Sequence, residues 1–475
     1  MSLTKASFSM INGASVNVLD FGAVGDAVTN DTAAIQAAID YAASLAYGAT
    51  VVFPPGAYLT TNTITLPYKV NLFGQAVGAR SSTNQNYGSV IVKAHANNAL
   101  LVNKTIAGPQ TITNIHIEGN NAANTAGDGI VIHASGVQLK SCRVWNILGK
   151  SFVVGDGSGP LSAYSAEFDD CYANTTQGAT AAYYIDSTDF RGRKLLSDGA
   201  EIAIDFTANA TNWSIADCRF EGYSVAGGRA VNAQGVTNGR VYFAGTSASA
   251  LYGFLVEGSA SNIRLNGLTI DRSDIRTAGS NAIRITGDAT GTIVKEAVIT
   301  NYDVGLYDSS SSSVSKTTAW NCVISGCNTS IYVNAQFGRY INNRFISSQV
   351  YDINHVLGQN GLWAENTFSL TGDSAINPAL SGQSGNFGTN AVKNNFNYKT
   401  KNSGYLGSVA SGDSISHGLA AAPVFNGSVI SVTVHGTGLT SPIVVTNPTS
   451  TTFDVSWVGT TPQPLTWEAR LMCDF

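Results

Sequence analysis

The sequence predicts an all-β solenoid, in which short strands stack coil upon coil around one long core. Runs of β-branched residues broken by Gly, Asn, Asp and Ser recur roughly every 20 to 30 residues between about Gly88 and Phe368. Within these runs, as in NIRLNGLTIDRSDIR at 262–276, apolar residues alternate with polar ones, which is typical of strands with one buried face. One short amphipathic helix is predicted near the N-terminus.

The helix is predicted to follow three residues whose side-chain oxygens can accept hydrogen bonds from its first backbone N–H groups, Thr29, Asn30 and Asp31. Apolar residues then recur at helical spacing at Ala34, Ile35, Ala38, Ile39, Ala42 and Leu45. A helix with one apolar stripe must lie against an apolar surface, and the residues that follow read as strands. We therefore expect it to cover the N-terminal end of the solenoid core.

Composition limits the classes of partner. Charged residues make up 12% of the chain, about half of the usual share of roughly 25%. The net charge of −5 argues against nucleic acid as the partner, because phosphate binding needs clustered Lys and Arg. No apolar run approaches the ~20 residues that span a bilayer, so no membrane insertion is expected. The N-terminus lacks a secretory apolar centre, which predicts a soluble cytosolic product.

The six cysteines show no metal-type spacing and lie mostly in apolar contexts, so buried reduced thiols are expected. No metal and no cofactor is predicted. The composition changes at about Ser369, and the last residues show strand signals separated by short turns, which indicate a small antiparallel β domain. The predicted organisation is an N-terminal arm (1–15), the helix and first strands (16–60), the solenoid (61–370), a linker (371–398) and a C-terminal β-sandwich-like domain (399–475).

The segment VNVLDFGAVGDAVTNDTAAIQAAIDYAASLAYGATVVFPPGAYLTT, from Val16 to Thr61, resembles the opening of the pectate-lyase-like right-handed parallel β-helix superfamily. It is most similar to the form found in bacteriophage tailspikes and polysaccharide depolymerases. The family usually has Gly where this chain has Ala27 and Asp where it has Asn30, and both departures lie in a turn. The stretches HGLAAAP at 417–423 and TWEA at 466–469 resemble a C-terminal module of phage tail fibres and tailspikes.

The resemblance implies a right-handed parallel β-helix with an N-terminal capping helix and a small C-terminal β domain. It further implies a homotrimer that associates with other phage tail proteins and is located in the virion. Its partner would be a bacterial capsular or O-antigen polysaccharide at the host cell surface. The predicted function is endo-cleavage of that polysaccharide. Glycoside hydrolysis is favoured, and the alternatives are a lyase acting by β-elimination and a non-catalytic receptor-binding virion protein.

Glycoside hydrolysis needs one carboxyl group to protonate the leaving oxygen and another to activate water or attack. The first candidate pair is Asp271 and Asp274, because a coil corner between Ile270 and Ile275 could turn both outward. Further predicted catalytic carboxylates are Glu257 and Glu221, and Arg272 or Arg264 would orient the sugar. The alternative is that the two aspartates cap a turn.

A second pair, Asp186 and Asp189, precedes the cations Arg191, Arg193 and Lys194. These residues could bind an acidic polysaccharide, with a cation stabilising the enolate of a lyase reaction. They could equally form a solvated salt-bridge patch.

A third candidate combines Asp217 and Glu221 with the nearby aromatic side chains Trp213 and Tyr223. The aromatic faces would stack on sugar rings while the carboxylates bind hydroxyl groups. The alternative is that both aromatic residues are partly buried amphipathic side chains.

Overall fold

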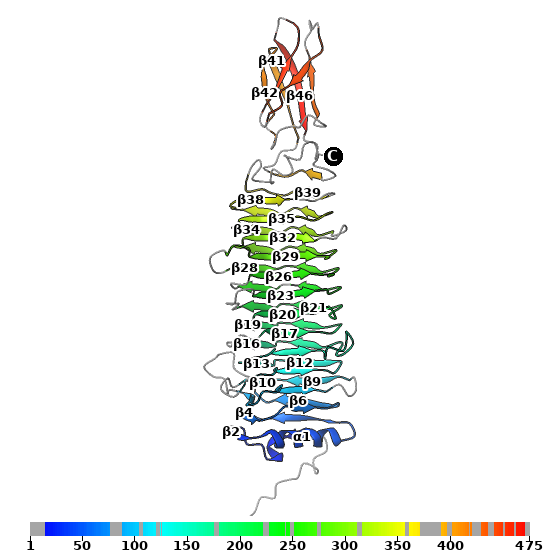
Figure 1. Ribbon diagram of the computed structural model, residues 1–475, viewed down its shortest axis with the longest axis vertical. Helices are drawn as coiled ribbons and strands as arrows, with labels where there is room; N and C mark the ends of the chain where they lie inside the picture. Colours follow the sequence, from blue (N-terminus) through cyan, green and yellow to red (C-terminus); the bar gives the residue numbers. More distant parts are fainter. Residues whose placement is uncertain are drawn as a thin grey trace, which may run out of the picture. The chain divides into compact units, whose positions relative to one another are not determined.

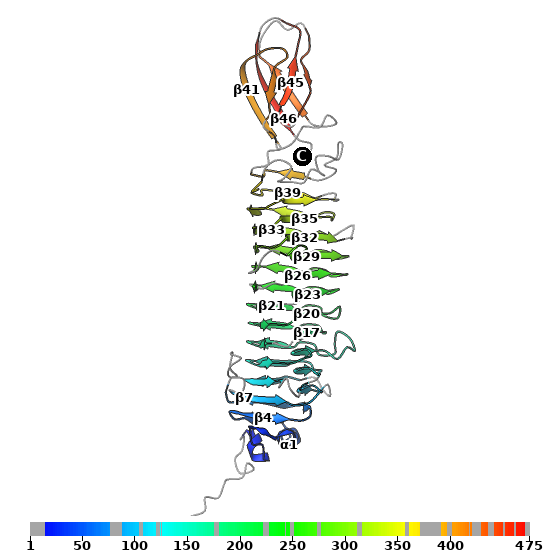
Figure 2. The same ribbon diagram turned by 60° about the vertical axis from the view of Figure 1, so that its left-hand side comes forward.

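The computed structural model describes residues 15–470 apart from a set of gaps. The gaps are 77–87, 104–107, 120–123, 125, 175–179, 222–227, 243, 248–250, 273–276, 311–315, 357–360, 371–390, 397–400, 418, 420–428, 436–440, 450–451 and 460–461. The fold is an all-β right-handed parallel β-helix of about 11 turns, with a small antiparallel domain at the C-terminus (Figures 1 and 2). The predicted fold class is thus confirmed.

Each coil of the β-helix contributes one short strand to each of three parallel sheets, which we name sheets A, B and C. Sheet A has 15 strands, in spatial order β1 (Val16–Asn17), β3 (Ala49–Phe53), β6 (Val70–Gly74), β9 (Gln110–Thr113), β12 (Val137–Lys140), β15 (Glu167–Asp169), β18 (Arg191–Arg193), β21 (Ser214–Ala216), β24 (Arg240–Tyr242), β27 (Arg264–Asn266), β30 (Ile293–Lys295), β33 (Thr318–Trp320), β36 (Arg339–Ile341), β39 (Leu362–Ala364) and β40 (Ala391–Lys393).

Sheet B has 13 strands: β2 (Asp26–Asn30), β4 (Gly56–Thr60), β7 (Ser89–Lys93), β10 (Ile115–Glu118), β13 (Arg143–Trp145), β16 (Tyr172–Asn174), β19 (Leu196–Asp198), β22 (Arg219–Glu221), β25 (Gly245–Ser247), β28 (Thr269–Asp271), β31 (Val298–Thr300), β34 (Val323–Ser325) and β37 (Arg344–Ile346). Sheet C has 12 strands: β5 (Ile64–Leu66), β8 (Leu100–Val102), β11 (Ile130–Ile132), β14 (Phe152–Val154), β17 (Ala181–Ile185), β20 (Ile202–Phe206), β23 (Arg229–Gln234), β26 (Tyr252–Glu257), β29 (Asn281–Gly287), β32 (Val304–Ser310), β35 (Thr329–Val333) and β38 (Tyr351–His355).

Helix α1 (Thr32–Ser44) is the only α-helix in the described part of the chain, and the 3₁₀ turn η2 (Val18–Phe21) precedes it. The predicted apolar stripe is largely confirmed, since Ile35, Ala38, Ile39 and Ala42 are buried. The helix packs against η2, β3 and β5, at the N-terminal end of the coils (Figure 1).

Asp31 was expected to accept a hydrogen bond from the first backbone N–H groups of α1, but Asn30 does so instead. Asn30 Oδ1 accepts the backbone N–H of Thr32 at 3.1 Å. Asp31, although it is the N-cap residue, makes no side-chain capping bond. Its carboxylate instead accepts the N–H groups of Val24 and Gly25 at 2.7 and 3.1 Å. Asp31 therefore connects the preceding loop to the start of the helix, whereas Asn30 accepts a hydrogen bond from the first residue of the helix.

Single residues in the left-handed backbone conformation turn the chain from sheet A to sheet B in successive coils. Ser141, Asp170 and Asp217 occupy these corners with φ of 51°, 54° and 55°. Asn and Asp tolerate this conformation better than most residues, which explains why the strand runs of the sequence are broken by such residues.

The chain divides into two compact units near residue 263. In the first, side chains that face inward stack between coils, and aromatic rings continue the stack. Phe152 and Tyr183 lie parallel with centroids 5.0 Å apart, and Phe206 lies 3.8 Å from Trp213. Five of the cysteines lie among the described residues, and all five are buried thiols that form no disulfide there, whereas Cys473 lies outside them.

The second unit contains the later coils and the C-terminal domain. Its coils have stacked inward rings of their own, for example Tyr340 on Trp363 with centroids 6.1 Å apart. Strand β40 continues sheet A within the stretch predicted as a linker. The C-terminal domain has two three-stranded antiparallel sheets, β41 (Lys401–Val409), β46 (Gln463–Arg470) and β43 (Val429–Val434), and β42 (Ser414–Ser416), β45 (Thr452–Ser456) and β44 (Val444–Thr446).

Candidate functional site

The candidate site lies on the outer face of sheet B, where three neighbouring strands present polar side chains to solvent. The middle residues of β16, β19 and β22 are Ala173, Ser197 and Phe220, and all three are buried. Because side chains alternate along a strand, the residues on either side of them point outward. Outward residues of neighbouring strands form two rows in register, Tyr172–Leu196–Arg219 and Asn174–Asp198–Glu221.

These rows enclose a small cavity, which we call the acidic hollow. Its volume is about 180 Å³, and it is lined by Tyr172, Leu196, Ser197, Asp198, Arg219 and Glu221. Register partners on neighbouring parallel strands are about 4.8 Å apart. Asp198 and Glu221 are such partners, so their Cα atoms are about that far apart.

The two carboxyl groups experience different surroundings. Burial raises the pKa of Asp198 above the ordinary aspartate value, and the negative charge of Glu221 raises it further. Glu221 is held by a cation, since Arg219 Nε donates to its Oε1 at 2.6 Å. A carboxyl group with a raised pKa beside one that is ion-paired is the arrangement that separates an acid from a base or nucleophile.

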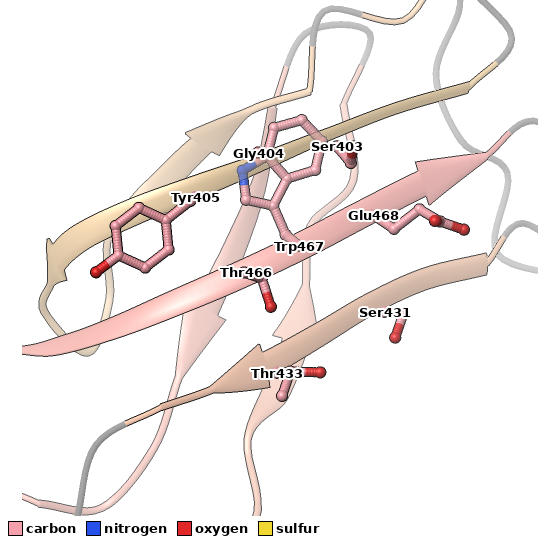
Figure 3. Close-up of a pocket in the computed structure, with 8 residues that line it drawn as sticks. All are labelled: Ser403, Gly404, Tyr405, Ser431, Thr433, Thr466, Trp467 and Glu468. Atoms are coloured by element: carbon pink, nitrogen blue, oxygen red, sulfur yellow. The ribbon is translucent and has the colours of Figure 1, made fainter.

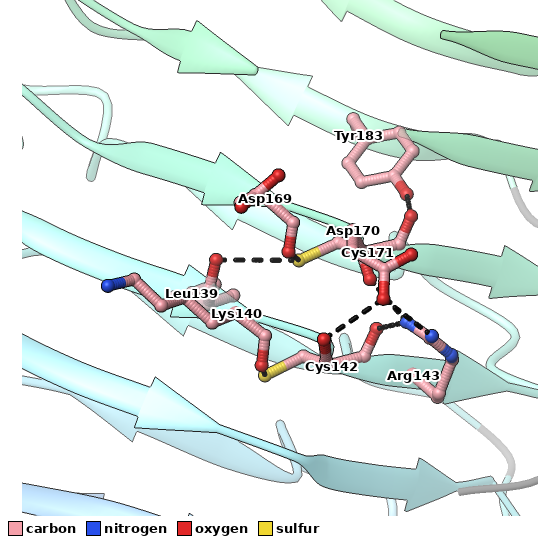
Figure 4. Close-up of polar contacts among 9 residues, drawn as sticks. Leu139, Lys140, Cys142, Arg143, Asp169, Asp170, Cys171 and Tyr183 are labelled. Atoms are coloured by element: carbon pink, nitrogen blue, oxygen red, sulfur yellow. Dashed lines mark hydrogen bonds and ion pairs between the residues drawn. The ribbon is translucent and has the colours of Figure 1, made fainter. Parts of the chain in front are cut away.

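Hydrogen bonds from the core fix the strands that carry the hollow (Figure 4). The buried Tyr183 hydroxyl lies 2.7 Å from the carbonyl oxygen of Cys171 and 2.8 Å from that of Leu196. One corner away, Arg143 forms an ion pair with Asp170 at 3.1 Å. The backbone at the start of β16 and β19 is thereby tied to the coil interior, which restricts where Tyr172 and Asp198 can lie.

The first predicted carboxylate set is not gathered on one sheet. Asp271 ends β28 of sheet B and accepts a hydrogen bond from the Thr300 hydroxyl on the next strand. Glu257 is on sheet C and Arg264 on sheet A, and Arg272 is only 4% exposed. Asp274 lies outside the described residues. This hydrogen bond joins two side chains on neighbouring strands, so both the catalytic role and the turn-capping alternative stay predictions.

The second predicted set is divided between a turn and a surface patch. Asp186 is buried and accepts hydrogen bonds from the side chains of Thr207 and Asn209. Asp189 occupies a coil corner with φ of 58°. The neighbouring cations pair with carboxylates of the preceding coil on sheet A, Arg191 with Glu167 at 3.3 Å and Arg193 with Asp169 at 2.9 Å. This arrangement matches the salt-bridge alternative.

The third predicted set contributes one residue to the acidic hollow, Glu221. Trp213 is 1% exposed and stacks on Phe206, so its ring presents no face to a sugar. Tyr223 lies outside the described residues. Sequence reasoning missed Asp198, Tyr172 and Arg219. The coil repeat is the signal that points to Asp198, because Asp198 precedes Glu221 by one coil. The strand register that pairs the two residues is visible only in the structure.

Comparison with known proteins agrees with the fold. A family model described as rhamnogalacturonase A/epimerase, pectate lyase-like, matches residues 15–229. This match lies within the β-helix and covers less than half of the chain. Mannuronan C5-epimerase AlgE1 of Azotobacter vinelandii is 46% identical over 69 residues, which are 13% of this chain and 5% of that enzyme. The chain therefore spans only a small part of the length of this curated relative.

Solved structures resemble the fold of this chain over most of its length. The A-module of mannuronan C-5 epimerase AlgE6 from Azotobacter vinelandii aligns with a TM-score of 0.54 and 16% identity, covering 81% of this chain and 96% of that one. A double mutant of the tailspike protein of E. coli bacteriophage HK620, in complex with a pentasaccharide, aligns with a TM-score of 0.57 and 9% identity. That alignment covers 96% of this chain and 93% of the tailspike. At these identities the likeness establishes the fold, and the predicted resemblance is confirmed at that level.

Two further findings concern the described ranges only. No helix there has the length and apolar character needed to cross a membrane. No group of three or more His, Cys, Asp or Glu side chains there is arranged to hold a metal ion.

Proposed function

We propose that this protein is a polysaccharide depolymerase that binds and endo-cleaves a bacterial capsular or O-antigen polysaccharide by glycoside hydrolysis at the acidic hollow. The observation that carries the proposal is the register pair of Asp198 and Glu221 in a cavity on the outer face of sheet B. Likeness to a tailspike with a bound pentasaccharide and to a mannuronan epimerase supports a polysaccharide as the ligand.

In the proposed reaction, Asp198 is the general acid. Its raised pKa keeps it protonated at a higher pH than an ordinary aspartate, so it can donate a proton to the leaving glycosidic oxygen. Glu221 acts from the neighbouring strand as the nucleophile, and its carboxylate attacks the anomeric carbon as the glycosidic bond breaks. Water, deprotonated by Asp198, then hydrolyses the glycosyl–enzyme ester and frees Glu221. These roles predict a retaining mechanism, in which the product keeps its anomeric configuration.

The remaining lining residues have supporting roles in this proposal. Arg219 orients the Glu221 carboxylate through its hydrogen bond. Tyr172 is half-buried, and its ring packs edge-on against Trp145 with centroids 6.2 Å apart. That contact fixes the ring as a platform for a sugar, because aromatic rings combine an apolar face with a polar tip.

The tailspike likeness also supports the biological setting that we propose. The protein is a homotrimer in a phage virion, associates with other phage tail proteins and acts outside the host cell at its surface. A trimer predicts a mass three times that of the chain in light scattering, and a monomer would contradict this part of the proposal.

The proposal is tested by incubating the protein with capsular and O-antigen polysaccharides while following polymer size, new reducing ends and ultraviolet absorbance of unsaturated uronates. Shortened chains with new reducing ends and no new absorbance are expected. Shortening with new absorbance would instead make it a lyase, and binding without shortening a receptor-binding protein.

Variants connect the activity to the hollow. Asp198→Asn and Glu221→Gln should each reduce cleavage by about 100-fold or more, the usual contribution of a positioned acid, base or nucleophile. Asp205→Asn is the control for Asp198, because burial also raises the pKa of Asp205, which lies on sheet C. Glu167→Gln is the control for Glu221, because it also removes an Arg–carboxylate pair. That pair joins Glu167 to Arg191 on sheet A, away from the hollow on sheet B. Normal cleavage by Asp198→Asn and Glu221→Gln would rule out the hollow as the active site.

A further inference from the structure

The C-terminal domain carries a second, larger hollow, which does not involve the β-helix. Strands β41, β46 and β43 form an open sheet, and a cavity of about 600 Å³ lies over it. Six side chains of the outer face line it, Ser403, Tyr405, Ser431, Thr433, Thr466 and Glu468 (Figure 3). We call these six residues the hydroxyl face, because five of them carry a hydroxyl group.

Strand register arranges the hydroxyl face in two rows. Ser403, Glu468 and Ser431 are aligned across the three strands, and Tyr405, Thr466 and Thr433 form the next row. Strands are about 4.8 Å apart, so neighbouring polar groups in a row repeat at about that spacing. A ligand lying across the strands would therefore meet a grid of hydroxyl groups that both donate and accept hydrogen bonds.

Beneath the hydroxyl face, Gly404 and Trp467 form the floor of the hollow (Figure 3). They are cross-strand partners, and a Cβ atom at Gly404 would lie 2.7 Å from Trp467 Nε1. Glycine is therefore needed for the close approach of strand and indole. The Trp467 ring also packs edge-on against Phe453 in the domain core, with centroids 5.7 Å apart. The floor is thus anchored to the core.

Two contacts fix polar groups of the hydroxyl face. His435 Nε2 lies 3.0 Å from the Thr466 hydroxyl, and Arg470 Nε donates to Glu468 Oε1. At the other end the Tyr405 side chain is 64% exposed, so its ring is open to a ligand. None of the lining residues is a cation, which disfavours an anionic ligand. Exposed aromatic surface beside several hydroxyl groups suits an uncharged sugar, whose ring stacks while its hydroxyl groups form hydrogen bonds.

We infer that the hydroxyl face is a second saccharide-binding site, specific for neutral sugars and independent of the acidic hollow. Binding there does not require that the β-helix cleave anything. An interface between copies of the chain is disfavoured by the lining itself, because such interfaces have apolar centres.

The test is saturation-transfer NMR on the full chain with glucose, galactose, rhamnose and N-acetylglucosamine as separate probes. We expect at least one of these sugars to receive saturation. Its affinity should fall about tenfold in Tyr405→Ala, the scale of one lost aromatic contact, and should also fall in Thr466→Val, which removes a hydroxyl group while keeping the side-chain shape. Tyr47→Ala is the matched control, because Tyr47 is 96% exposed and belongs to the first unit.

A parallel experiment in the Glu221→Gln variant separates the two sites, since sugar binding should persist there at wild-type affinity. The inference is overturned if none of the four sugars receives saturation, or if binding is unchanged in both Tyr405→Ala and Thr466→Val. It is also overturned if Tyr405→Ala changes the oligomeric mass in light scattering and leaves sugar binding intact, because the face would then be an interface.

Discussion

The Tyr183 hydroxyl offers a sharp test of how the core supports the acidic hollow. Tyr183→Phe removes one oxygen atom and leaves the ring, which stacks on Phe152 at an interplanar angle of 6°. The lost group is the hydroxyl donor, whose single proton is shared in a fully buried site between Cys171 O at 2.7 Å and Leu196 O at 2.8 Å. The substitution therefore tests hydrogen bonding without creating a large cavity.

A buried hydrogen bond contributes a net stability of about 0.5–1.5 kcal/mol, and one hydroxyl proton makes one such bond even when two acceptors share it, so the substitution predicts destabilisation within that range. Both acceptors are backbone carbonyls at the start of the strands that carry Tyr172 and Asp198. Cys171 O also accepts the N–H of Leu196 at 2.9 Å and so keeps a partner in the variant. We accordingly expect a loss of about 1 kcal/mol.

The assay is the unfolding rate in guanidinium chloride, which remains interpretable when refolding is incomplete. Tyr184→Phe is the control, because it removes the hydroxyl of the next residue in β17, a half-buried side chain whose ring lies beneath Lys150. Tyr183→Phe should unfold about fivefold faster, the rate change that corresponds to about 1 kcal/mol, and Tyr184→Phe should unfold at the wild-type rate. Equal rates for the two variants would refute the reasoning.

Four further predictions concern backbone strain, packing and charge. Ala27 has φ of 65°, so Ala27→Gly should raise the unfolding free energy by about 1 kcal/mol in a denaturant titration. A Cβ at Gly239 would lie 2.2 Å from the buried Trp213 ring, so Gly239→Ala should lower the melting temperature, as about 1–3 kcal/mol of overpacking predicts. The folded state raises the pKa of Asp198, so ionised Asp198 lowers the free energy of unfolding at a pH above the folded-state pKa. At a pH below the unfolded-state pKa, Asp198 is protonated in both states and has no such effect. Asp198→Asn should therefore stabilise the protein at neutral pH, and this gain should vanish in acid. Glu221→Gln should lower the pKa of Asp198 in a carboxyl NMR titration, although burial should keep it above 3.8.

Much of the fold could be predicted because its signals are local and repeated. Ile263, Leu265, Leu268 and Ile270 were expected to face inward, and all four are buried. The strands of sheets A and B are mostly only three residues long, and single left-handed residues separate them. Sequence alone locates such strands but does not give their register, because coil length varies.

The site was harder to predict for the same reason. Neighbours on a β-helix surface are one coil apart in sequence, whereas pairs such as Asp186 and Asp189 are neighbours along one strand or turn. Asp198 precedes Gly199 and resembles a turn residue in sequence, yet strand register makes it the partner of Glu221. Trp213 lies beside carboxylates in sequence, but Gly239 leaves room for its ring in the core.

The most direct test of the central claim is a double-mutant comparison of kcat/KM for polysaccharide cleavage. The account predicts that Asp198→Asn and Glu221→Gln each reduce kcat/KM by about 100-fold or more. Because acid and nucleophile act as one unit, the double variant should have nearly the same kcat/KM as the less active of the two single variants. Wild-type kcat/KM in either single variant would contradict the account, as would losses in the double variant that simply multiply.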